Sequence, residues 1–199
     1  MVGERTDGRR PATRRRGSAL RDAIFAAALD RLRADGFAGL TMEGIAAAAD
    51  TGKAALYRRW PNKEALVTEA LEAALPSLAD VAPQASVRAD LLALLGCFRD
   101  AMAAASGAAF QVLKAEAAQA GLVHAIVRRH IFEPYRTRAI EALARGIERG
   151  EVRPGADTPL IANVGPAMLI HYSVTEDPEI PEEHVTAVVD DVLLPMLRP

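Results

Sequence analysis

The sequence has few of the residues that build covalent cross-links or β-sheets. Its 199 residues include a single cysteine, Cys97, and only 5% aromatic side chains. One cysteine cannot form an intrachain disulfide or a cysteine-built zinc site, so we expect a protein of a reducing compartment. Scarce aromatics together with abundant alanine favour helices over sheets.

Long apolar runs are also missing. Charged residues interrupt every apolar stretch well before the roughly 18 residues that a membrane-spanning helix needs. No apolar segment follows the basic N-terminal residues, because Arg21 and Asp22 come too soon for a secretory signal peptide. We therefore expect a cytoplasmic protein with no membrane partner.

Enzyme signatures are not found either. The sequence contains no GxSxG, HExxH, GxxxxGK[ST] or GxGxxG motif. Its histidines lie at positions 124, 130, 171 and 184, and no two have the four-residue spacing of a helical metal site. We expect no catalytic residues, no metal site and no cofactor, although a site assembled only in three dimensions remains the rival hypothesis of an enzyme.

Charge is unevenly spread although the net charge is only −2. Residues 1–60 carry 12 Lys and Arg against 7 Asp and Glu, whereas residues 61–199 carry 12 against 19. A basic N-terminal part on an acidic body indicates that the basic part meets a polyanion. Residues 1–17, with six arginines, are predicted to be a disordered arm, which either stays in solvent or contacts DNA phosphates or the minor groove.

The spacing of apolar residues predicts an all-α fold, because no alternating strand pattern appears. Caps, glycines and prolines set the helix boundaries. Pro134 is expected to kink the long helix in which it lies. The predicted helices cover residues 18–36, 42–49, 53–60, 63–75, 86–105, 123–149, 157–175 and 182–197, with a further one between Gly107 and Gly121.

Residues 42–61, MEGIAAAADTGKAALYRRWP, have the pattern of a helix-turn-helix. Ala46 is small where the two helices must cross. Asp50 occupies the turn position that usually needs a left-handed backbone, which Asp tolerates better than most residues. The second helix presents Lys53, small residues and Arg58, so that its backbone can approach the major groove.

Residues 18–66 resemble the DNA-binding domain of the tetracycline-repressor (TetR) family of bacterial regulators. The resemblance rests on three segments: GFAGLTM at 36–42, IA at 45–46 and TGKAALYRRWPNKEAL at 51–66. Asp50 in place of the usual Gly and Trp60 in place of the usual Phe depart from the family pattern. Beyond residue 66 the likeness extends to length, helical character and the corner at 149–157.

The resemblance implies a three-helix DNA-binding domain at 18–64 and a helical ligand-binding and dimerisation domain at 65–199. Family members bind DNA phosphates through the residues matching Thr41, Tyr57 and Lys63, and meet bases or phosphates through the recognition helix. The predicted DNA-binding residues are Thr41, Thr51, Gly52, Lys53, Ala54, Ala55, Tyr57, Arg58 and Lys63.

The C-terminal region implies two further partners. Apolar stripes on helices 157–175 and 182–197 are too wide for one chain to cover, which indicates a homodimer. A closed apolar cavity within residues 86–175 is expected to hold an apolar or aromatic small molecule. Its candidate ligand-binding residues are Phe98, Met102, Phe110, Leu113, His124, Tyr135, Met168 and Tyr172.

Together these features predict a transcriptional repressor that binds double-stranded DNA at a palindromic operator and is released by its effector. The alternative is an effector-independent DNA-binding dimer.

Overall fold

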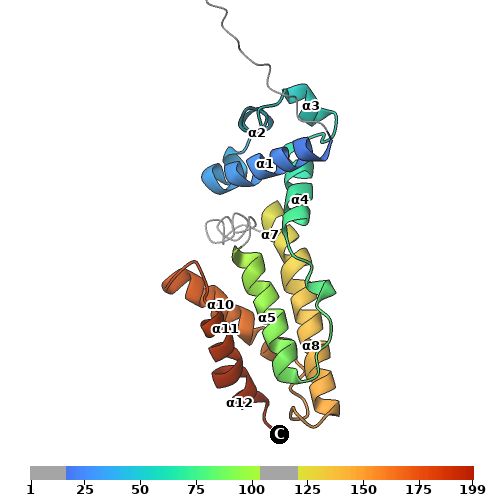
Figure 1. The fold of residues 1–199 in the computed structure, drawn as a ribbon, viewed down its shortest axis with the longest axis vertical. Coiled ribbons are helices and arrows are strands. Elements are labelled where there is room, and N and C mark those ends of the chain that lie inside the picture. The colour runs from blue at the N-terminus through green and yellow to red at the C-terminus, as the bar shows by residue number, and fades with distance from the viewer. Residues whose placement is uncertain (1–16, 104–120) are drawn as a thin grey trace, which may run out of the picture.

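The structure is a computed structural model that describes residues 17–103 and 121–199. Within those residues the chain forms helices and connecting segments and no β-strand, which confirms the all-α prediction. Three helices gather at one end, and the longer helices of the remainder extend away from them (Figure 1). We call the first group, residues 18–60, the head, and residues 75–199 the body.

The head contains α1 (Ser18–Gly39), α2 (Met42–Ala48) and α3 (Lys53–Tyr57). Helix α1 buries Ile24, Ala28 and Leu32 on one face, as the helical spacing predicts. Gly36 has a positive φ of 66° and interrupts α1 where the sequence predicted its end. Helix α3 ends at Tyr57, three residues before the predicted end at residue 60. The chain turns between Tyr57 and Pro61.

Helix α4 (Lys63–Ala74) joins the head to the body. The Asn62 side chain caps it by accepting a hydrogen bond from the backbone N–H of Ala65 at 2.9 Å. Its buried face packs against α1 on one side and against α7 (Leu122–Val127) on the other. The predicted domain boundary after residue 64 therefore falls inside a continuous helix that both parts share.

The body is built around two long antiparallel helices, α5 (Val87–Ala103) and α8 (Glu133–Glu148), which pack against one another (Figure 1). The other described segments of the body are η1 (Leu78–Asp80), α7, η2 (Arg128–Phe132), α9 (Pro159–Ala162), α10 (Val164–Thr175), α11 (Glu182–Ala187), η3 (Val188–Leu193) and α12 (Leu194–Leu197). The helix predicted between Gly107 and Gly121 lies outside the described residues.

Two of these segments, η2 and η3, are π-helical turns, and each ends shortly before a proline. Pro134 follows η2, and Pro195 follows η3. A proline inside a helix has no N–H to donate, and its ring collides with the carbonyl four residues earlier, so a wider turn relieves the crowding. The kink predicted at Pro134 thus takes the form of a widened turn just before it.

Charged side chains tie the body together at the end farthest from the head. Asp90 is buried on α5 and accepts a hydrogen bond from the Arg145 guanidinium on α8 at 3.0 Å. The Glu151 carboxylate accepts the backbone N–H of Val87 at 2.6 Å. Arg88 donates two hydrogen bonds, at 2.7 and 2.8 Å, to Asp190 on η3.

Candidate nucleic-acid interface and effector sites

The turn between α2 and α3 has the geometry that the sequence predicted. Asp50 has φ of 51°, and it is the one non-glycine residue of the described chain in that left-handed region. The backbone N–H of Thr51 closes the turn by donating to the Ala46 carbonyl at 3.0 Å. Ala46 and Leu56 are buried, so α2 and α3 cross closely over a small core.

Thr41 marks the N-terminus of α2. Its Oγ1 accepts a hydrogen bond from the Gly44 N–H at 3.1 Å, which confirms the predicted cap. Thr41 is exposed, so its backbone and hydroxyl stand at a helix N-terminus open to an anion.

The predicted DNA-binding residues on the turn, on α3 and just after it follow one another in the chain, and α3 lies at the outer end of the head (Figure 1). Thr51 and Ala55 are half-buried against the core beneath it. The exposed members of the set are Gly52, Lys53, Ala54, Tyr57 and Arg58. Tyr57 is unusual for an aromatic residue in being 45% exposed. A small, cationic and partly aromatic surface of this kind can enter a major groove and bind phosphates.

Glu43 shares this surface, and sequence reasoning missed it. It is exposed on the first turn of α2 and forms an ion pair with the Lys53 ammonium. The hydrogen bond from Lys53 lowers the pKa of the Glu43 carboxyl, and the same bond raises the pKa of Lys53. The Lys53 Nζ also lies 5.6 Å from the centre of the Tyr57 ring. The sequence did hold a signal for this role, because Glu43 is an acidic residue within the helix-turn-helix segment 42–61, where binding to DNA favours basic and small residues.

Lys63 makes intramolecular bonds at the end of α1. Its ammonium donates to the carbonyls of Phe37 at 2.9 Å and Leu40 at 3.1 Å, with a longer bond to Ala38. It also lies 4.7 Å from the centre of the Phe37 ring. Helix carbonyls at a C-terminus attract cations, so Lys63 stabilises the junction of α1 and α4. Its predicted phosphate contact stays a prediction.

Trp60, which replaces the usual Phe of the family, belongs to the core. It is 3% exposed and packs on Phe25, with ring centres 5.8 Å apart. Its indole N–H donates to the Glu69 carboxylate on α4 at 2.6 Å. Trp60 therefore holds the turn that follows α3 against α4.

The candidate ligand-binding residues that the structure describes are spread over the aromatic core and two separate hollows. Phe98 and Tyr135 are buried and in edge-to-face contact, 5.5 Å apart, and burial raises the pKa of the Tyr135 hydroxyl. Met102 is also buried, whereas Met168 is half-buried against the same core. Phe110 and Leu113 lie outside the described residues, and the closed apolar cavity stays a prediction.

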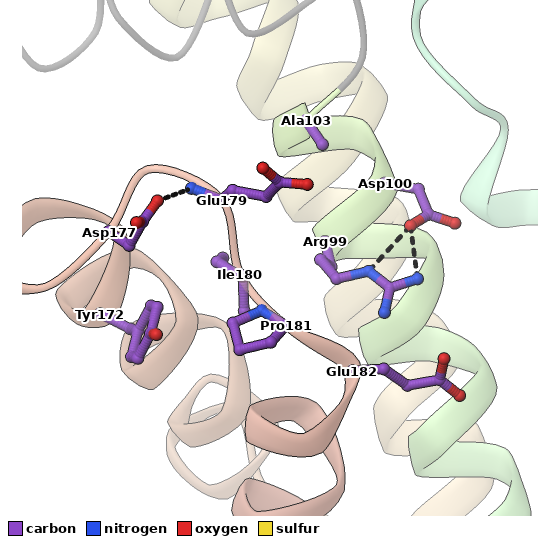
Figure 2. Close-up of a pocket in the computed structure, with 9 residues that line it drawn as sticks. All are labelled: Arg99, Asp100, Ala103, Tyr172, Asp177, Glu179, Ile180, Pro181 and Glu182. Carbon is purple, nitrogen blue, oxygen red and sulfur yellow. Dashed lines mark hydrogen bonds and ion pairs between the residues drawn. The ribbon is translucent and has the colours of Figure 1, made fainter.

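Tyr172 lines a different hollow, of about 590 Å³, between α5, α10 and the loop before α11 (Figure 2). Arg99 is held there by two hydrogen bonds to Asp100. The remaining polar lining is acidic, and the hollow is open to solvent. The other lining residues are Ala103, Asp177, Glu179, Ile180, Pro181 and Glu182.

His124 lies on the rim of an open groove of about 470 Å³ between α7, η2, α8 and α10. Phe132, which lies 5.7 Å from Phe98, connects the groove to the aromatic core. The groove combines apolar walls with two guanidinium groups, one imidazole and one carboxylate. Its lining consists of His124, Arg128, Phe132, Glu133, Arg136, Asn163, Pro166, Ala167 and Ile170.

Comparison with known proteins decides the family. A model of the bacterial regulatory proteins of the tetR family matches residues 24–70, and one of the tetracyclin repressor-like C-terminal domain matches residues 81–192. The chain belongs to the TetR family. It is a DNA-binding transcriptional regulator, and the helix-turn-helix of the head is its DNA-binding element.

Individual relatives agree with this TetR-family assignment. The chain is 33% identical to the DNA-binding transcriptional repressor TetR of Mycobacteroides abscessus, over 92% of this chain and 97% of that one. Among solved structures, PfmR from Thermus thermophilus superposes with a TM-score of 0.71 at 20% identity, covering 90% of this chain and 97% of that one. FadR from Bacillus subtilis, solved in complex with stearoyl-CoA, superposes at 0.67 with 18% identity over 88% and 96%.

Two kinds of feature are not found among the described residues. None of the helices in residues 17–103 and 121–199 is long and apolar enough to cross a membrane. The same residues contain no cluster of three or more histidine, cysteine or acidic side chains suited to a metal ion.

Proposed function

We propose that this regulator is a homodimeric repressor that binds a palindromic operator and is released by a small amphipathic anion held in the groove beside His124. The two heads of a dimer would place one α3 each in successive major grooves, through the residues from Thr41 to Lys63 named above. A regulator of chromosomal genes works where the DNA is, so we place it in the cytoplasm.

Exposed apolar side chains on the last helices support the dimer. Leu160 on α9 is 79% exposed, Val174 on α10 is 62% exposed and Met196 on α12 is 40% exposed. Val188 and Val189, from the same predicted stripes, are buried within the chain and satisfy only part of the apolar surface. A second copy of the chain would cover the rest. Light scattering should then give twice the 21.2 kDa mass of one chain.

The charges of the groove support an anionic effector. Arg128 pairs with Glu133 at 3.7 Å, whereas Arg136 has no ion pair within the described part of the chain. Phe132 and Ile170 add apolar walls, so a carboxylate with a hydrocarbon or aromatic tail would fit both kinds of surface. An apolar or aromatic effector was expected from the sequence, and the groove adds an anionic group to that expectation. The stearoyl-CoA of the B. subtilis protein is an anionic amphiphile held by a similar fold.

The proposal that the effector releases DNA rests on the contact between α4 and the segments α7 and η2, which line the groove beside His124. His130 on η2 lies 3.1 Å from the Glu72 carboxylate on α4. Helix α7, which packs against α4, supplies His124 to the groove. A ligand that moves α7 and η2 must therefore move α4, and α4 carries the head. Release follows if the ligand binds the displaced arrangement more tightly than the DNA-bound one.

The test uses three ten-carbon probes that differ in charge: decanoate, decanol and decylamine. Each is titrated into the protein bound to a fluorescent duplex that the protein has selected from a random pool. We expect decanoate to release the DNA at the lowest concentration. Arg136→Gln should raise that concentration about tenfold, the effect of losing one charge-assisted bond.

Arg129→Gln is the matched control, because Arg129 lies on η2 but lines a different groove, beside Ala79 and Glu141. It should release DNA at the wild-type decanoate concentration. Equal release by decylamine, or an Arg136→Gln protein that responds like wild type, would contradict the anionic site. DNA binding that ignores all three probes would favour the effector-independent dimer.

A further inference from the structure

A carboxylate on the DNA-facing surface of a DNA-binding head needs a physical reason. Glu43 is the second residue of α2, and Lys53 is the first residue of α3. Their side chains are 57% and 55% exposed, yet they form an ion pair across the helix-turn-helix. Among the cations of α3 and the turn after it, Lys53, Arg58 and Arg59, only Lys53 has such a partner in the described part of the head.

The pair changes what Lys53 offers to DNA. A phosphate that approaches the Lys53 ammonium must compete with the Glu43 carboxylate and is repelled by it. Phosphates are the same on every sequence, so this penalty applies to every duplex. A base edge differs, because guanine presents two acceptors, N7 and O6, side by side in the major groove. A duplex with guanine in reach of Lys53 compensates best for the loss of the pair, and the neutral base edge is not repelled by the Glu43 carboxylate as a phosphate is.

The position of the pair favours a base over a phosphate as the final partner of Lys53. Lys53 lies at the N-terminal end of the recognition helix, the end that contacts base edges in helix-turn-helix proteins. Gly52 and Ala54 on either side are small and exposed, so the backbone can approach the groove closely. The Tyr57 ring, 5.6 Å from the ammonium, limits the directions in which Lys53 can extend.

We propose that Glu43 is a specificity-determining residue. It holds the Lys53 ammonium within the protein, and it thereby weakens binding to arbitrary DNA more than binding to an operator with guanine opposite Lys53. The proposal rests on the DNA-binding role of the head and adds a discriminating residue to it. It needs neither the effector nor the dimer.

Glu43→Gln tests the proposal, with Glu64→Gln as its matched control. Both residues are exposed acids at the second position of a helix, so both substitutions remove one charge from a helix N-terminus. Only Glu43 pairs with Lys53. Binding to a random-sequence duplex and to the operator selected from a random pool is measured by fluorescence anisotropy at several salt concentrations.

We expect Glu43→Gln to bind the random duplex about eightfold more tightly at 0.1 M salt, the effect of one added phosphate contact. The salt slope on that duplex should steepen by about one. Binding to the operator should change less than twofold, and a fresh selection with the variant should lose the guanine preference at the position that Lys53 reaches. Glu64→Gln should match wild type in all four measurements.

A double mutant separates the pair from a general field effect. In a Lys53→Gln background, Glu43→Gln should no longer tighten binding to the random duplex. An unchanged ratio of operator to random affinity, weaker binding to both duplexes, or a gain that survives the loss of Lys53 would each overturn the proposal. If wild type enriches no sequence from the pool, the operator itself is refuted, an outcome distinct from failure of the Glu43 effect. Circular dichroism confirms that each variant is folded.

Discussion

The bonds of Lys63 predict that this residue stabilises the head, independently of any role in binding DNA. Lys63→Met keeps most of the aliphatic stem and removes the ammonium. The carbonyls of Phe37 and Leu40, at 2.9 and 3.1 Å, then lose a charged donor. The Phe37 ring also loses the cation 4.7 Å from its centre.

The size of the effect follows from these contacts. A hydrogen bond to a charged group contributes about 1.5–3 kcal/mol when its partner is left without a replacement. Lys63 is half-buried, so water can partly replace its ammonium at the two carbonyls. The loss of free energy of unfolding should therefore be smaller than the sum of two such bonds. We expect a loss of about 2 kcal/mol in the free energy of unfolding. Urea denaturation followed by far-ultraviolet circular dichroism measures it.

Lys53→Met is the control for this experiment, because the Lys53 ammonium is bonded to an exposed carboxylate rather than to helix carbonyls. It should leave the free energy of unfolding unchanged within error. If Lys63→Met is as stable as wild type, the reasoning from the carbonyl bonds is refuted. A loss of DNA binding at full stability would instead assign Lys63 to phosphate contact alone.

Three further perturbations test other parts of the structure. Gly165→Ala should lower the free energy of unfolding by about 1–3 kcal/mol, because a Cβ there would lie 2.8 Å from a side-chain carbon of α5, whereas Gly96→Ala, with open space around it, should not. Glu151→Gln should lower the free energy of unfolding at neutral pH but match wild type well below pH 4. The hydrogen bond from Arg149 lowers the pKa of Glu151 in the folded protein. The ionised carboxylate therefore stabilises the fold above the ordinary carboxyl pKa, and this stabilisation is lost as the pH falls through the lowered pKa. Asp50→Gly should raise the thermal midpoint, because glycine adopts φ of 51° without strain.

The helix-turn-helix could be predicted from the sequence because its signals are local. The Thr41 cap and the left-handed Asp50 each depend on a few neighbouring residues. The bonds of Lys63 could not be predicted in the same way, because the carbonyls it meets lie 23 to 26 residues earlier and carry no signature of their own. Local sequence does not encode which distant helix end a lysine will reach.

The residues of the proposed effector site were less predictable for a related reason. Apolar periodicity marks Phe98, Tyr135 and Met168 as inward-facing, but it does not separate a side chain that touches a ligand from one that touches another helix. Arg128 and Arg136 border the groove, yet their sequence context is that of ordinary exposed charges on a helix. Only the folded chain, in which residues of η2, α8 and α10 line one groove, gives them a shared surface.

The ion pairs at the far end of the body set where the molecule can bend. Asp90, Glu151 and Arg88 cross-link α5 to α8, to the corner after α8 and to η3 at that end. Near the head, the body contacts α4 through the packing of α7 and through the half-exposed pair of His130 and Glu72. The distal bonds add to the aromatic packing of Phe98 on Tyr135 farther along the same two helices. We therefore expect the distal bonds to keep that end of the body in place if an effector shifts α4 and the recognition helix α3.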